Sequence, residues 1–140
     1  MSNWSKKEVW SRRSGSFCVS VEHWRGGADH ERGADRWGVY AYVYPEHPLF
    51  KRFALRPLAA RPDIYSIREK CLVDAPLHCG CTLVRPHHKA DGTVTSVQFG
   101  ADYSHIDDDR FSHCSEFGGE VERDADALFA WMIEAAREGT

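Results

Sequence analysis

The sequence predicts an α+β fold, in which an antiparallel sheet of about four strands packs against one long C-terminal helix. Two observations carry this prediction. Several segments between residues 16 and 101 alternate apolar and polar residues with a period of two, which is typical of half-buried strands. The C-terminal segment instead places apolar residues three and four positions apart, which is typical of an amphipathic helix.

The first two predicted strands cover residues 16–24 and 37–44. Alternate apolar residues in these segments are expected to face the core: Phe17, Val19, Val21, Trp37, Val39, Ala41 and Val43. Ser20 and Glu22 are expected on the opposite face of the first strand. Pro45 ends the second strand, because proline cannot donate to a sheet ladder. Between the two strands, residues 25–36 are glycine-rich and charged, which predicts a surface loop.

Two further strands are predicted at residues 81–85 and 93–101, joined by a hairpin loop around residues 90–92. In the second of them, Val97, Phe99 and Ala101 are expected to face the core. His87, His88 and Lys89 are expected to be exposed near the hairpin tip. A short helix capped by Asp63 is predicted over residues 63–72.

The C-terminal helix is predicted from one apolar stripe: Val121, Ala125, Leu128, Phe129, Met132 and Ala136. Asp124 near its start and Arg137 near its end suit the helix dipole. Trp131 lies on the flank of the stripe, which predicts partial exposure. The stripe is expected to pack across the sheet.

Composition and charge limit the class of protein. The chain has 140 residues, 42% of them apolar and 28% charged, which excludes intrinsic disorder and predicts a single globular domain over residues 1–140. Eighteen basic residues against 21 acidic ones give a net charge of −3, which argues against direct binding of DNA or RNA. No cofactor is predicted.

The N-terminus and the cysteines indicate the compartment. The N-terminal residues lack the apolar region of a signal peptide, and no stretch approaches the about 18 apolar residues of a membrane span. Five cysteines are an odd number in a chain that can build its own core, which favours reduced thiols. We therefore expect a cytoplasmic protein that does not enter the membrane.

Two short tracts contain residue types that carry chemistry. The first, residues 77–82, places a histidine and a glycine turn before a predicted strand. The second, residues 100–111, runs from a predicted strand into a loop and contains Asp102, His105 and Asp108. Because the two strands are expected to pair as a hairpin, the two tracts are expected to meet at one edge of the sheet.

Three motifs between residues 37 and 111 resemble a family of small phage and prophage proteins. They are Pro45-Glu46-His47-Pro48-Leu49, His78-Cys79-Gly80-Cys81-Thr82 and Gly100-Ala101-Asp102-Tyr103-Ser104-His105. The family typically shows a strand ending in Pro-x-His-Pro-Leu, a His-Gly-Gly-x-Thr turn and a Gly-x-Asp-x-x-His-x-Gly-Asp segment. The resemblance implies a phage context and a shared pocket, without an activity.

The matched positions are candidate ligand- or partner-binding residues: His78, Gly80, Thr82, Asp102, His105 and Asp108. Gly100 also matches the family pattern. Cys79 and Asp107 stand where the family has glycine, and the second substitution argues against a tight glycine turn at that position.

Three interpretations of these residues stay open. The favoured one is that the aspartate and histidine side chains tie a turn together through hydrogen bonds. A metal site is the second, because imidazole and carboxylate suit zinc, manganese or iron, although no His-x-x-x-His or Cys-x-x-Cys spacing supports it. The third is acid–base chemistry by Asp102 and His105, with Ser104 or Cys79 as the nearest nucleophile.

A different class of function is indicated by Tyr40, Tyr42 and Tyr44, which share one face of the second predicted strand. Such a platform can stack on a base or accept a protein partner. We therefore expect a small accessory binding protein. The motif resemblance implies that it is of the phage type and that interference in host defence is its use. It would hold a host protein or a nucleotide-like small molecule at a Tyr/His/Asp site. The alternative is a small hydrolase, metal-assisted or driven by an Asp–His pair, that acts on a phosphorylated or acylated small molecule.

Overall fold

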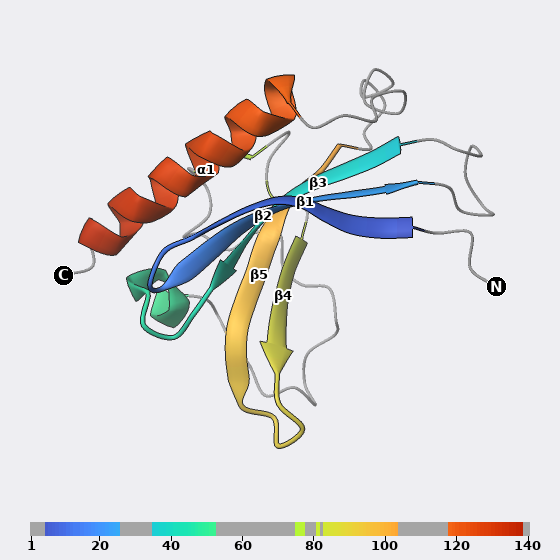
Figure 1. Ribbon diagram of the computed structural model, residues 1–140. Helices are drawn as coiled ribbons and strands as arrows, with labels where there is room; N and C mark the ends of the chain where they lie inside the picture. Colours follow the sequence, from blue (N-terminus) through green and yellow to red (C-terminus); the bar gives the residue numbers. More distant parts are fainter. Residues whose placement is uncertain are drawn as a thin grey trace.

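The computed structural model contains one antiparallel sheet of five strands and a C-terminal helix (Figure 1). It describes residues 5–25, 35–52, 75–77, 81, 83–103 and 118–138. The strands are β1 (Ser5–Arg13), β2 (Phe17–Arg25), β3 (Asp35–Val43), β4 (Leu83–His88) and β5 (Val94–Asp102). The helix is α1 (Gly119–Glu138), and the short 3-10 helix η1 (Pro48–Arg52) follows β3. The α+β fold predicted from the sequence is therefore confirmed.

The strands lie in the order β1-β2-β3-β5-β4, and each neighbouring pair is antiparallel. The predicted hairpin is β4–β5, in which Leu83 pairs with Gly100 and His87 with Ser96. Its loop contains Gly92 at φ 92°, a conformation that favours glycine. The Asp91 carboxylate accepts a hydrogen bond from the Thr93 N–H at 2.9 Å and holds this turn closed.

The fifth strand, β1, differs from the prediction of about four strands. It is an edge strand rich in lysine and arginine, with the sequence Ser-Lys-Lys-Glu-Val-Trp-Ser-Arg-Arg. Its pairing with β2 shifts register between Glu8 and Trp10, so its apolar residues do not alternate. Charged residues and bulges protect sheet edges from pairing with other chains. The same features hide the period-two pattern by which a strand is found in a sequence.

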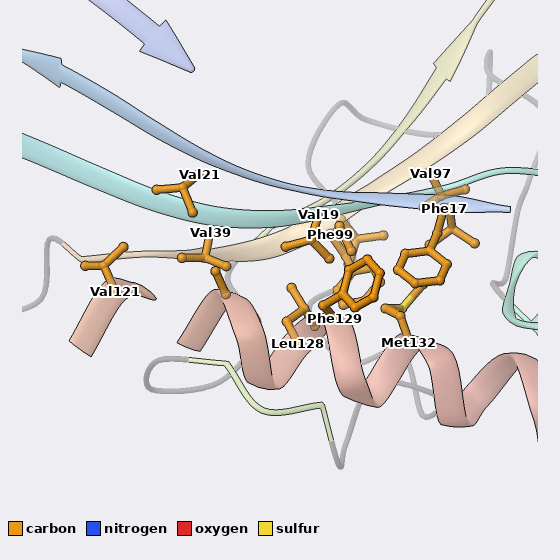
Figure 2. Packing of buried hydrophobic residues seen from close by; sticks show 14 of the residues in the cluster. Phe17, Val19, Val21, Val39, Val97, Phe99, Val121, Leu128, Phe129 and Met132 are labelled. Carbon is orange, nitrogen blue, oxygen red and sulfur yellow. The ribbon is translucent and has the colours of Figure 1, made fainter. Parts of the chain in front are cut away.

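The apolar residues of the sheet and of α1 form one core (Figure 2). Figure 2 shows Phe17 and Val19 of β2 and Phe99 of β5 directed toward the helix, where Leu128 and Met132 meet them. The core positions predicted for the strands and for the helix are buried, apart from Ala136, which is half-buried. Burial of each large apolar side chain contributes about 1.5–3 kcal/mol. As predicted, Trp131 on the flank of the helix is half-buried.

The turn after β3 is tied to α1 by His47, whose side chain is 0% exposed. Its Nδ1 accepts a hydrogen bond from the Leu49 N–H at 3.0 Å, so Nε2 carries the proton and donates to the Met132 carbonyl oxygen, also at 3.0 Å. Burial lowers the pKa of His47, which favours the neutral ring that both bonds require. The histidine of the Pro-x-His-Pro-Leu motif thus has a structural role.

Two predicted segments fall outside the described residues: the helix at residues 63–72 and most of the loop at residues 25–36. Among the helices that the structure describes, none has the length and apolar character needed to cross a membrane.

Candidate functional site

The sheet face opposite α1 carries polar and aromatic side chains, and we call it the polar face. The described residues that register places on it include Glu8, Arg13, Cys18, Ser20, Glu22, Arg36, Tyr40, Tyr42, Arg85, His87, Ser96, Gln98 and Asp102. On β2, β3 and β5 these positions alternate with buried apolar residues of the core. The polar face is the candidate functional site.

Charge on the polar face is sorted into rows that run across the strands. Glu8 pairs with Glu22, Glu22 with Gly38, and Gly38 with Asp102, so three carboxylates share one row. We call Glu8, Glu22 and Asp102 the acidic row. Four residues further along β3, a second row runs through Cys18, Tyr42 and Gln98, and Arg13 and Arg85 stand at its two ends.

Between these rows lies Tyr40, which pairs with Ser20 on one side and Gly100 on the other. Its ring occupies the space that Cβ atoms would need at Gly38 and Gly100, and its hydroxyl oxygen lies over Gly38. The two glycines therefore let the ring settle onto the backbone. This corrects the expectation of an exposed platform of three tyrosines: Tyr40 is only 8% exposed, while Tyr42 and Tyr44 are half-buried.

Tyr42 forms the accessible aromatic part of the polar face. Its ring lies 5.9 Å from that of His87, and His87 Nε2 donates to Gln98 Oε1 at 2.7 Å. His87 belongs to β4 and is half-buried, so the expectation that it is exposed at the hairpin tip is wrong. The hydrogen bond to Gln98 draws the imidazole onto the sheet.

Burial and negative charge both act on the tyrosine hydroxyls. Burial raises the pKa of Tyr42 to about 12, and the carboxylates of Glu22 and Glu8 act in the same direction. The pKa of Tyr40 is raised further by burial and then by Glu22 and Asp102. Both phenols are therefore neutral at physiological pH, and each can donate a hydrogen bond as well as accept one.

At the outer end of the acidic row, Glu8 contacts the neighbouring Ser20. The Ser20 hydroxyl donates to Glu8 Oε2 at 2.8 Å, which satisfies a serine that is 1% exposed. By contrast, the Tyr40 hydroxyl makes no hydrogen bond within the described parts of the chain. A buried hydroxyl without a partner is costly, and such groups are rare in folded proteins.

Of the site residues predicted from the two motif tracts, the structure describes only Asp102, which is half-buried at the end of β5. The others, His78, Gly80, Thr82, His105 and Asp108, lie outside the described residues, so their meeting at one edge stays a prediction. Cys81, which belongs to the first motif tract, is half-buried, packs against the core and donates to the Leu83 carbonyl oxygen at 3.2 Å. Such contacts are typical of a thiol that packs as a small apolar side chain.

Sequence reasoning missed Glu8 and Gln98 as parts of this face, although it placed Ser20 and Glu22 away from the core. Within the part of the chain that the structure describes, no three His, Cys, Asp or Glu side chains are grouped so that they could hold a metal ion. Comparison of the chain with protein-family models, with curated proteins and with solved structures finds no match.

Proposed function

We propose that this chain is a small phage-type accessory protein that binds a host protein through the polar face, in the cytoplasm of a bacterial host. The phage context comes from the motif resemblance, and interference with a host defence system is the use that it suggests. One observation of the structure supports binding: α1 packs on one face of the sheet, whereas the other holds half-buried Tyr42 and Asp102 beside the buried Tyr40 hydroxyl.

The chemistry of the polar face favours a protein over a nucleotide as the occupant. A tyrosine such as Tyr42 offers a large contact area and a polar tip, and it loses little conformational entropy on binding. The charges are sorted into an acidic row and a row ended by Arg13 and Arg85, a pattern that a protein surface can complement. Carboxylates of Glu22 and Asp102 on both sides of Gly38 repel a phosphate group there.

A capture experiment tests this proposal. Tagged wild-type protein, Tyr42→Ala and the control Glu134→Ala, which alters an exposed residue of α1, are immobilised and exposed to host lysate. We expect a host protein that the wild type and the control retain and Tyr42→Ala loses. Circular dichroism establishes that all three proteins are folded.

Two results would overturn the proposal. One is that every retained protein binds all three baits equally. The other is that mass spectrometry of small molecules released on heating finds a nucleotide in wild type and control but not in Tyr42→Ala, which would support the nucleotide-like ligand instead. The hydrolase alternative depends on His78 and His105 and stays a prediction from the sequence.

A further inference from the structure

The acidic row contains a gap with a buried hydroxyl at its centre. Glu22 and Asp102 flank Gly38 on the two neighbouring strands, so their Cα atoms are separated by two strand spacings, about 10 Å. Gly38 has no side chain, and the Tyr40 hydroxyl occupies the place that its Cβ would take. Glu22 and Asp102 are half-buried, so solvent reaches both sides of this gap.

The Tyr40 hydroxyl is the observation that points to a ligand. The residue is 8% exposed, and its hydroxyl makes no hydrogen bond within the described residues. Its hydrogen and its lone pairs are available at a position between two carboxylates. Negative charge on both sides excludes an anion there and favours a cation that also donates hydrogen bonds.

We propose that the gap between Glu22 and Asp102 binds the guanidinium group of an arginine side chain from the partner protein, which donates to Asp102 and to the Tyr40 hydroxyl oxygen. This inference rests on the proposed function, because it names the group by which the partner is recognised. Glu22 takes part in another interaction, so it contributes its negative charge and no contact is assigned to it.

The planar shape of guanidinium is the reason for choosing arginine. Its five N–H donors are spread over a rigid fork that can reach a carboxylate and a neighbouring hydroxyl together, whereas the ammonium of lysine is a compact point charge. A metal ion is a poorer occupant, because the described residues offer no group of three metal-ligating side chains. The chain has an arginine of its own nearby, Arg36, which is the next residue of β3 on this face. Arg36 makes no ion pair within the described residues, so it does not occupy the gap between the two carboxylates.

The test uses three small probes and amide NMR spectra of the ¹⁵N-labelled protein. N-acetyl-argininamide is expected to shift the amide signals of Gly38, Tyr40 and Asp102 in a saturable manner. N-acetyl-citrullinamide, which has nearly the same shape without the charge, is expected to shift none of them. Spermidine serves as the third probe, because a free polyamine is the other source of a cation with several N–H donors.

Variants separate contacts from general charge. Asp102→Asn is expected to weaken argininamide binding about tenfold or more, and Tyr40→Phe about two- to tenfold. The control Asp126→Asn removes one exposed carboxylate from α1 and is expected to leave the affinity unchanged. An equal effect of Asp102→Asn and Asp126→Asn would show that net charge alone attracts the probe and would overturn the site.

The remaining outcomes separate this inference from the proposed function. No shift with argininamide, or equal shifts with citrullinamide, would overturn the arginine site. Shifts with spermidine alone would assign the gap to a polyamine and overturn it as well. If Tyr42→Ala abolishes capture of the host protein while Asp102→Asn does not, partner binding stands and the arginine contact fails. Loss of capture in both variants, with the argininamide shifts, supports both.

Discussion

The two faces of the sheet bury side chains of opposite chemistry to a similar degree. On the helix side, Phe17 and Phe99 are 0% exposed and belong to the apolar core, so burial itself stabilises them. On the polar face, Ser20, Gln98 and Tyr40 are 1%, 7% and 8% exposed, and each polar group needs a partner. Ser20 has Glu8 and Gln98 has His87, whereas the Tyr40 hydroxyl has none among the described residues.

This difference indicates that the helix side of the sheet stabilises the fold, whereas the polar face is suited to binding. On the helix side, the apolar side chains of the sheet are covered by the apolar side chains of α1. On the polar face, the buried Tyr40 hydroxyl makes no hydrogen bond to the described residues, so an added donor or acceptor there gains more than it would at an exposed residue. Substitutions on the two faces should therefore have different effects on folding and on binding.

The largest effect is expected on the helix side. Phe99→Ala removes a fully buried ring between sheet and helix and should lower the free energy of unfolding by about 3–5 kcal/mol. The control Thr95→Ser, at an exposed position of the same strand, keeps the hydroxyl that donates to the His87 carbonyl oxygen and should change it by less than about 0.5 kcal/mol. Urea denaturation measures both. A loss below about 1 kcal/mol for Phe99→Ala would show that packing of this ring between sheet and helix does not stabilise the core as expected.

The next effect concerns the glycines under Tyr40. A Cβ at Gly38 would collide with the end of the Tyr40 ring, so Gly38→Ala should cost about 1–3 kcal/mol in the free energy of unfolding. The cost should largely vanish in a Tyr40→Ala background, because the obstructing ring is gone. At Gly100 a Cβ would also meet the backbone carbonyl of Val39, so the cost of Gly100→Ala should persist in that background.

A double-mutant cycle measured by urea denaturation gives these coupling energies. Equal costs of Gly38→Ala with and without Tyr40 would contradict the position of the hydroxyl over Gly38, and with it the centre of the proposed arginine site.

Most of the helix side of the sheet could be predicted from the sequence, but little of the polar face could. Alternation at Phe17, Val19 and Val21, and the spacing from Val121 to Met132, are visible without coordinates because burial of apolar groups needs only their periodicity. The acidic row depends on register between strands far apart in the chain, which single-sequence periodicity does not encode. β1 escaped prediction because its bulge breaks the alternation.

The glycines within the strands are a second reason why the polar face could not be predicted from the sequence. Within a strand, Gly38 and Gly100 suggest local weakness from sequence alone, whereas in the structure they make the space for Tyr40. The three tyrosines alternate along one strand, which predicted a single platform, whereas the two neighbouring glycines distinguish Tyr40 from Tyr42.

A smaller effect is expected from pH. Burial holds the pKa of His47 below its ordinary value of about 6.5, so below that pH the unfolded chain binds a proton that the folded chain does not. The contribution of His47 is fully present above about pH 6.5 and is lost as the pH falls toward its folded pKa, by at most about 1.4 kcal/mol per pH unit. His47→Gln removes this titration. Urea denaturation of both proteins at several pH values between 7.5 and 5 should show a flatter profile for the variant, and parallel profiles would refute the assignment.

The smallest effect has the most direct bearing on the polar face. Tyr40→Phe removes a buried hydroxyl that has no partner among the described residues, so the free energy of unfolding should stay the same or rise by up to about 1 kcal/mol. Tyr103→Phe is the matched control, because the Tyr103 hydroxyl donates to Asp124 on α1 and its loss should cost about 1–2 kcal/mol. If urea denaturation shows that Tyr40→Phe costs as much as Tyr103→Phe, the Tyr40 hydroxyl has a partner within the folded chain. It would then not be available to an arginine.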